Sequence, residues 1–86
     1  MKHYASSRFW NCYRVLPESI QELANENYQL LRSDPSHPSL CFKKVRNGQY
    51  RSVRISMKYR ALGIPVPDGI QWFWIGNHAE YDRLPG

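Results

Sequence analysis

One run of apolar residues constrains the fold of this 86-residue chain more than any other segment. Residues 70–75 read Ile-Gln-Trp-Phe-Trp-Ile, and five of these six side chains are large and apolar. Such a run is typical of a β-strand that is covered on both faces. Gly76-Asn77 follows it and ends the strand. We therefore expect a sheet in which residues 70–75 form a central strand, with Trp72 and Trp74 in the core.

Two helices are expected before the sheet. The first, over residues 6–15, carries three aromatic residues at helical spacing that are expected to pack against the sheet: Phe9, Trp10 and Tyr13. The second starts at Leu16-Pro17-Glu18, where a proline in the first turn and an acid near the positive helix end favour a helix start. Its apolar residues keep a 3.6-residue period as far as Leu31. The prolines at positions 35 and 38 end it, because neither can continue the hydrogen-bonded ladder.

Three further segments predict strands. Residues 41–45 and 50–55 flank Asn47-Gly48, a dipeptide that strongly favours a tight hairpin. Alternation places Arg51, Val53 and Ile55 on one face of the second strand, and Ser52 and Arg54 on the other. Residues 59–64 predict the next strand, and Pro65 to Gly69 a turn. Residues 78–84 are expected to form a loop with one helical turn.

This order predicts an α+β domain: two N-terminal helices packed on a three- to four-stranded, mainly antiparallel sheet, with a short C-terminal helical turn. A chain of 86 residues is long enough for one hydrophobic core. Since no repeat, linker or low-complexity tract divides it, we expect residues 1–86 to form a single domain.

The sequence also argues against several classes of function. Cys12 and Cys41 have no metal-ligand spacing and do not suggest a disulfide scaffold, which favours a reducing, cytoplasmic compartment. No apolar stretch approaches the length of a membrane span, and no apolar signal segment follows the first residues, so no membrane partner is expected. Since no phosphate-binding loop, dinucleotide fingerprint or nucleophile elbow is present, neither a cofactor nor a metal is expected.

The positive charge is unevenly distributed. The chain has a formal net charge of +5, and no acid occurs between Asp34 and Asp68. Seven cations lie in this interval: Lys43, Lys44, Arg46, Arg51, Arg54, Lys58 and Arg60. Such a field attracts phosphates and is typical of a surface that binds RNA or another polyanion. The alternative is a basic face that only contacts solvent.

Four local patterns, in this order along the chain, resemble the RelE/ParE family of bacterial toxins from type II toxin–antitoxin systems. They are Leu16-Pro17 at the start of the long helix, Asp34-Pro35 through Leu40 and Lys43 ahead of the sheet, Tyr50-x-x-x-Arg54 followed by Tyr59-Arg60, and Ile75-Gly76-x-His78-x-x-Tyr81 at the end. Each pattern is weak alone, but their order spans almost the whole chain. The family usually opens with a longer first strand, whereas only Met1 to Ala5 precede the first helix here. A rudimentary or missing edge strand is therefore expected.

The resemblance implies two different activities. Many relatives are metal-independent endoribonucleases that enter the ribosome and cut mRNA, which inhibits translation, whereas ParE-like relatives poison DNA gyrase without cutting nucleic acid. Both kinds are neutralised by a cognate antitoxin. Fold alone does not choose between them, and a non-toxic binding domain of the same fold is the third alternative.

The residues that suit RNA cleavage are expected near the ends of the strands. His78 is the best acid–base candidate, because imidazole titrates near neutral pH and this residue follows the central strand. Arg60 matches the arginine of the family's Tyr-Arg strand, and Arg54 matches the basic residue of the preceding strand. Both are expected to hold the scissile phosphate with their guanidinium groups. Tyr81, one helical turn after His78, is expected to stack on a base or donate its hydroxyl.

Each of these residues also has a purely structural interpretation. His78 can hydrogen-bond its own loop, Arg60 can pair with Glu80 or Asp82, Arg54 can be a solvated strand residue, and Tyr81 can pack on Leu84. The remaining cations are assigned to contacts with the RNA backbone, with bystander charge as the alternative. They are Lys43, Lys44, Arg46, Arg51 and Lys58.

Overall fold

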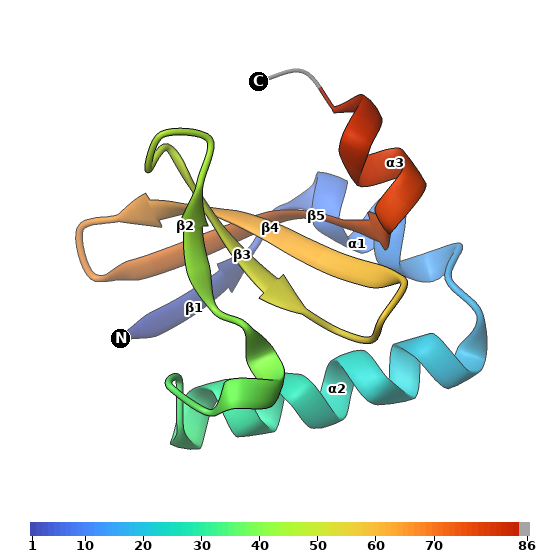
Figure 1. The fold of residues 1–86 in the computed structure, drawn as a ribbon, viewed down its shortest axis with the longest axis horizontal. Helices are drawn as coiled ribbons and strands as arrows, with labels where there is room; N and C mark the ends of the chain where they lie inside the picture. The colour runs from blue at the N-terminus through green and yellow to red at the C-terminus, as the bar shows by residue number, and fades with distance from the viewer. Residues whose placement is uncertain (85–86) are drawn as a thin grey trace.

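A five-stranded mixed sheet forms the centre of the protein in the computed structural model, which describes residues 1–84. The elements in chain order are β1 (Lys2–Ala5), α1 (Ser7–Arg14), α2 (Glu18–Ser33), the 3₁₀ turn η1 (Pro38–Leu40), β2 (Lys43–Val45), β3 (Tyr50–Arg54), β4 (Tyr59–Val66), β5 (Gly69–Asn77) and α3 (His78–Arg83). The strand order is β1-β5-β4-β3-β2 (Figure 1). The α+β class and the two helices that precede the main sheet are confirmed.

The apolar run lies inside the sheet, as its composition predicts. β5 has β1 on one side and β4 on the other, and the side chains of Trp72 and Trp74 are almost fully buried. The middle strand of the five is β4, because β3 and β2 extend the sheet beyond it. A register shift opposite Leu62 and Gly63 makes a bulge in β5. It places Trp72 and Ile75, three residues apart, in the same core.

β1 is the edge strand that was expected to be rudimentary or missing. It is present and gives the sheet one more strand than expected. It pairs in parallel with β5, from Lys2 opposite Gly69 to Ala5 opposite Trp72. The N–H of Lys2 donates to the Asp68 carbonyl at 2.9 Å, and the N–H of Ser6 donates to the Trp72 carbonyl at 3.0 Å. A Cβ at Gly69 would collide with the backbone of Lys2. The glycine therefore permits the close approach of β1.

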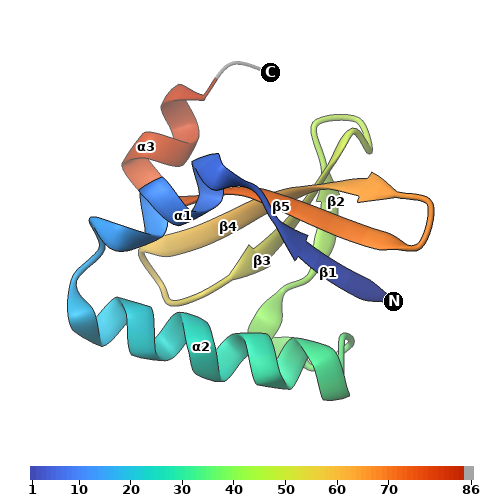
Figure 2. The same ribbon diagram turned by 180° about the vertical axis from the view of Figure 1, so that it is seen from behind.

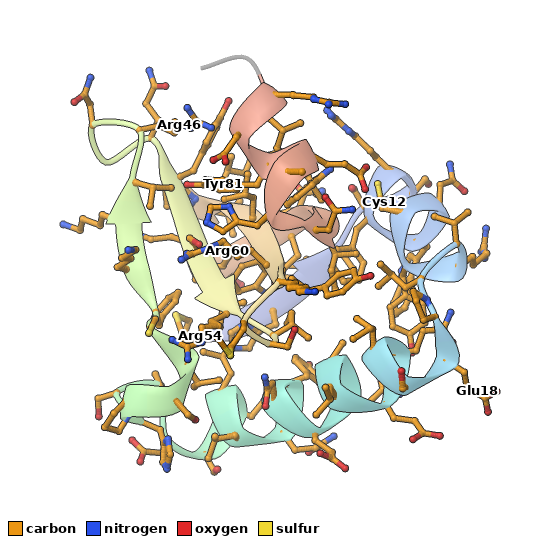
Figure 3. All side chains as sticks on the ribbon, turned by 45° about the vertical axis from the view of Figure 1, so that its right-hand side comes forward. Cys12, Glu18, Arg46, Arg54, Arg60 and Tyr81 are labelled. Atoms are coloured by element: carbon orange, nitrogen blue, oxygen red, sulfur yellow. The ribbon has the colours of Figure 1, made fainter. Side chains whose placement is uncertain are left out.

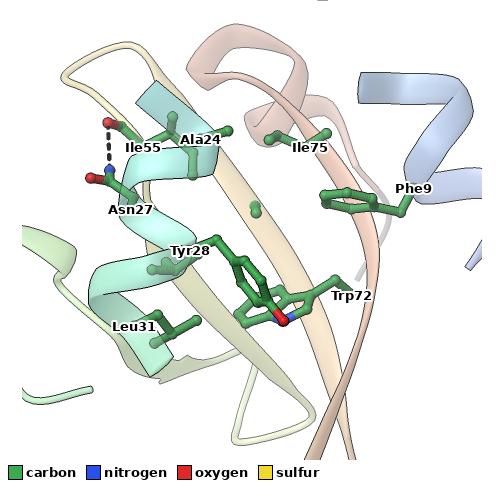
Figure 4. Close-up of a pocket in the computed structure, with 10 residues that line it drawn as sticks. Phe9, Ala24, Asn27, Tyr28, Leu31, Ile55, Trp72 and Ile75 are labelled. Carbon is green, nitrogen blue, oxygen red and sulfur yellow. Dashed lines mark hydrogen bonds between the residues drawn. The ribbon is translucent and has the colours of Figure 1, made fainter. Parts of the chain in front are cut away.

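α2 covers one face of the sheet, as the two opposite views show (Figures 1 and 2). Its apolar stripe packs Ala24 and Leu31 against Val53, Ile55 and Trp72. A cavity of about 60 Å³ remains between α2 and the sheet (Figure 4). Among residues 1–84, no helix has both the length and the apolar character needed to cross a membrane.

α1 packs against β5, but only part of its aromatic cluster is buried. Ser6 caps the helix by accepting the N–H of Phe9 at 3.2 Å. Phe9 and Tyr13 pack on the core, as expected. Trp10 is 44% exposed, so the expectation that it packs against the sheet is wrong. It instead meets the edges of the Phe9 and Tyr13 rings.

Two strand boundaries differ from those expected. β2 begins at Lys43 because Cys41 adopts a left-handed conformation (φ 44°) directly after η1. β4 continues through Pro65 to Val66 rather than ending at Ile64. Its pairing with β3 stops at Gly63, so Pro65 has a hydrogen-bonding neighbour on the β5 side only. Proline is tolerated there because its missing N–H leaves no gap in a ladder.

His3 connects β1 to the core. Its Nδ1 accepts the indole N–H of Trp72 at 3.1 Å, its ring stacks on that indole, and its edge meets Tyr28 of α2. The acceptor role requires a neutral imidazole. Burial lowers the pKa of His3 from its ordinary value, and the positive N-terminal amino group and Arg32 add to the effect.

We expect this contact to make the stability of the fold depend on pH. Because the pKa of His3 is lower in the folded than in the unfolded chain, the unfolded chain takes up this proton first as the pH falls through 6.5. The contribution of His3 to stability is thus present above that pH and lost below it. His3→Asn keeps an acceptor without titrating, so its melting temperature should fall less than that of the wild type between pH 7.5 and about 5. Parallel pH profiles for the two proteins would contradict this.

Candidate nucleic-acid interface

Strand register decides which side chains share the face of the sheet opposite α2. Val53 pairs with Ala61, and both are buried under α2. Their neighbours therefore point to the opposite face. Arg54 lies directly across from Arg60 there, and Ser52 across from Leu62. The prediction that Arg54 points away from Val53 and Ile55 is confirmed.

Tyr81 of α3 lies over this face and gathers two guanidinium groups. The Cζ of Arg60 is 5.6 Å from the centre of the Tyr81 ring, and the Cζ of Arg46 is 5.2 Å from it. On the strand side, Arg60 Nη1 donates to Ser52 Oγ at 3.1 Å. We call Arg46, Arg54, Arg60 and Tyr81 the arginine–tyrosine cluster; Figure 3 shows them in the order Arg46, Tyr81, Arg60, Arg54 from the β2–β3 turn toward α2. The cluster joins α3 to the consecutive segments from the β2–β3 turn to β4.

Arg54 stands at the end of this cluster nearest α2. Its Nη1 lies 3.5 Å from the Sγ of Cys41, a weak contact, and its backbone carbonyl accepts an amide hydrogen of Asn27 at 3.1 Å. The same amide group also reaches the carbonyl of Ile55 at 2.9 Å. Asn27 thus holds the end of β3 in place from α2. Among residues 1–84, the guanidinium of Arg54 has only this weak contact.

The pairing of Arg54 with Arg60 is unfavourable for folding alone, because like charges directly opposite each other destabilise a sheet. The two ion pairs found within residues 1–84 join Lys2 to Asp68 and His78 to Asp82. Neither includes one of these arginines, so the pairing of Arg60 with Glu80 or Asp82 does not occur. Two arginines at paired positions, without an ion pair among residues 1–84, favour an anion on this face of the sheet.

His78 lies beside the cluster rather than within it. As the first residue of α3 it donates its backbone N–H to the Lys58 carbonyl at 2.6 Å, and its ring meets the ring of Tyr81 edge-on at 5.8 Å. Its Nδ1 is 3.6 Å from a carboxylate oxygen of Asp82, and its side chain is half exposed. The Nδ1 side therefore faces Asp82, which leaves Nε2 for a proton transfer with a ligand.

The five cations assigned to RNA backbone contacts are divided between different surfaces. Lys43 pairs with Ser52 and so shares the face of the cluster, whereas Lys44 and Arg51 pair with each other and point to the other face. Arg51 donates to the carbonyl of Gly48 at 2.8 Å. Lys58 is exposed in the connection between β3 and β4, near the start of α3.

Arg46 is anchored more firmly than the sequence suggested. Its Nη2 donates to the Tyr81 carbonyl at 3.3 Å, and its Nε is buried without a hydrogen-bond acceptor. The residue also has a positive φ of 55°. Its guanidinium therefore fixes α3 on the sheet, which leaves it less available to a phosphate than an extended side chain.

The acids of α2 lie on the other side of the molecule. Glu18, Glu22 and Glu26 are exposed on the helix that covers the opposite face. The protein is therefore electrostatically polarised, with its arginine–tyrosine cluster turned away from the main acidic stripe. A polyanion is steered toward the cluster side.

Within residues 1–84, no group of three His, Cys, Asp or Glu side chains is placed to hold a metal ion. A larger hollow of about 300 Å³ lies between β1, α1 and α2, lined mainly by aromatic side chains such as Tyr4, Trp10 and Tyr28. It lies away from the arginine–tyrosine cluster. The cluster is thus an open surface of guanidinium groups and one aromatic ring, which suits an extended nucleic acid strand.

Sequence reasoning missed two residues that organise this surface, Ser52 and Asn27. Strand alternation did place Ser52 on the face of Arg54, but its contact with Arg60 depends on the register of β3 with β4. Asn27 occurs in the apolar stripe of α2, and the sequence gives no sign of a role for its amide group. Its two bonds to β3 are visible only once the helix is docked.

The fold and the half-buried arginine pair define a class: small basic α+β domains in which a long helix covers one face of the sheet and cations lie on the other. A family model described as a ParE-like toxin domain matches residues 18–83. The chain belongs to this family of toxin domains. A search of curated protein sequences finds no match.

Solved structures share the fold at low sequence identity. A chain of the RelB–RelE antitoxin–toxin complex from Methanococcus jannaschii superimposes with a TM-score of 0.74 at 18% identity, covering 95% of this chain and 99% of that one. YafQ from E. coli strain BL21(DE3) gives 0.74 at 10% identity, covering 93% and 96%. A chain of the YoeB–YefM complex from Staphylococcus aureus gives 0.68 at 15% identity, covering 91% and 97%. The expected RelE/ParE fold is confirmed.

Proposed function

We propose that this toxin is a metal-independent endoribonuclease that cuts mRNA on the ribosome. The observation that carries the proposal is the pair of arginines, Arg54 and Arg60, which lie directly across two strands. Among residues 1–84 neither forms an ion pair with a carboxylate, and Arg60 lies beside the ring of Tyr81. Guanidinium groups bind phosphate through paired N–H donors, and an aromatic ring offers a surface on which a base can stack.

The chemistry needs three contributions. The 2′-hydroxyl attacks the adjacent phosphorus after a base removes its proton, and the P–O bond to the 5′-oxygen breaks as an acid protonates that oxygen. Arg54 and Arg60 stabilise the negative charge that develops on the phosphoryl oxygens. His78, through Nε2, and the hydroxyl of Tyr81 are the groups available for the two proton transfers. Lys43 and Lys58 contribute contacts to the RNA backbone on either side.

The partner that neutralises this activity is a cognate antitoxin. The RelB–RelE structure is described as an antitoxin–toxin complex, and a DinJ–YafQ structure from E. coli as a toxin–antitoxin complex. An acidic segment of an antitoxin is suited to the same guanidinium groups and would exclude RNA from them. A small acidic protein encoded by the neighbouring reading frame would support this assignment.

Cleavage is tested in a translating extract with mapped mRNA ends. Wild-type protein should produce new ends, and His78→Ala should cut at least about tenfold more slowly, because general acid–base groups usually contribute about 10²-fold or more. Ala79→Ser, a change at the neighbouring exposed position of α3, is the matched control and should cut normally. If folded wild-type protein produces no new mRNA ends in the extract, the nuclease assignment is refuted.

Inhibition of DNA gyrase is the second candidate, and the match to a ParE-like family model favours it. In that case the basic surface and the α1–α2 hairpin make protein contacts, and no residue acts on RNA. Loss of supercoiling by purified gyrase, with translation unaffected, would establish this candidate. Harmless overproduction without an antitoxin would instead indicate a binding domain of the same fold.

A further inference from the structure

Ser52 is the one polar side chain in the fully buried part of the described residues, with no exposed surface. It lies in the middle of β3, between the side chains of Lys43 and Leu62 in the register of the neighbouring strands. A hydroxyl that is buried without a hydrogen-bond partner destabilises the folded state. An alanine would fill the same position without an unpaired hydroxyl. The hydrogen-bond partner of Ser52 therefore indicates what the buried hydroxyl does.

That partner is the guanidinium of Arg60. Ser52 Oγ accepts a hydrogen bond from Arg60 Nη1 at 3.1 Å. Because the serine is shut off from solvent, its oxygen has no water to exchange with, and the bond direction is fixed by the rigid strand. The Tyr81 ring contacts the same guanidinium at 5.6 Å from above. One hydrogen-bond acceptor and one ring contact together fix the orientation of the planar guanidinium.

We propose that Ser52 is a positioning residue for Arg60. A guanidinium has five N–H donors in a fixed plane, and the bond to Ser52 occupies one of them. The other four, on Nε, on Nη2 and the second on Nη1, are thereby aimed in a constant direction for a phosphate. This assignment rests on the proposed function, since the phosphate is that of the RNA. Arg54, held only by a weak contact to Cys41, is free to adjust to its ligand.

The first test is a double-mutant cycle on single-turnover RNA cleavage. Ser52→Ala should reduce the cleavage rate about tenfold, because Arg60 then loses the charge-assisted hydrogen bond that orients it. In an Arg60→Ala background the same change should have almost no further effect. Val53→Ala, at the adjacent buried position on the other face, is the matched control, and its effect should be the same in both backgrounds. Equal losses from Ser52→Ala in both backgrounds would overturn the proposal.

The second test observes the guanidinium itself by NMR. Rotation about the Cζ–N bonds of Arg60 should be slow in the wild type and clearly faster in Ser52→Ala, whereas the exposed Arg83 should rotate fast in both proteins. Fast rotation of Arg60 in the wild type would overturn the positioning role, whether or not RNA is cut. Slow rotation without any cleavage would instead overturn the proposed nuclease function and leave the contact between the two residues intact.

Discussion

Replacing Arg60 with alanine is expected to lower the rate of mRNA cleavage about 10²- to 10³-fold, the usual effect of removing one preorganised donor to a transition-state charge. Of the two arginines that face each other, Arg60 has the better-defined guanidinium, which is held between Ser52 and the ring of Tyr81. Its donors are therefore in place before the phosphorus takes on extra charge. Single-turnover cleavage of a defined message in a translating extract measures the effect.

Two further variants distinguish the effect of the orientation of the Arg60 guanidinium from the effect of positive charge on this face of the sheet. Arg60→Lys keeps the positive charge but loses the planar fork, so it should recover only a small part of the lost rate. Lys43→Ala removes an exposed cation from the same face and should mainly weaken binding, in a salt-dependent way. Cleavage by Arg60→Ala at the wild-type rate would show that the paired arginines do not act on the phosphate.

The core of this fold is predictable because its strongest signals are local. The apolar run of β5 and the 3.6-residue stripe of α2 each identify their own buried face, and the structure places both in one core. Prolines 35 and 38 end α2 through their missing N–H groups, which is also a local effect. Such features are decided within a few residues, so a single sequence is sufficient to find them.

The edge of the sheet is harder to predict because β1 has no pattern of its own. Four residues are too few to show alternation, and parallel pairing links positions almost 70 residues apart. What permits the pairing is Gly69, whose missing side chain leaves room for the backbone of Lys2. From sequence alone that glycine is indistinguishable from a residue of the Asp68-Gly69 turn.

The candidate site is predictable in composition but not in arrangement. Alternation along β3 was enough to place Arg54 on the open face. The position of Tyr81 over Arg60 required α3 to fold back across β4 and β5, and the anchoring of Arg46 required an unusual backbone conformation. Those are tertiary contacts between segments that share no sequence period. They decide which of the cations remain available to a phosphate.

Trp72→Ala is expected to have the largest effect on stability, about 3–5 kcal/mol. The indole is 6% exposed and packs against His3 and Phe42, and its N–H donates to His3. It also lines both the cavity under α2 and the hollow beside α1. Its removal enlarges these spaces and leaves His3 Nδ1 without a donor. Urea denaturation followed by circular dichroism measures the loss.

The size of this effect matters because a domain of this length has a total stability of about 4–13 kcal/mol. Trp72→Ala is thus expected to leave little or no folded protein, in which case Trp72→Phe, which keeps most of the ring volume, gives a measurable smaller loss. Trp10→Ala is the matched control: the same chemical change at a side chain that is 44% exposed should cost much less. Equal losses of stability at the two positions would mean that the buried side chain of Trp72 in β5 contributes no more to the core than an exposed tryptophan does.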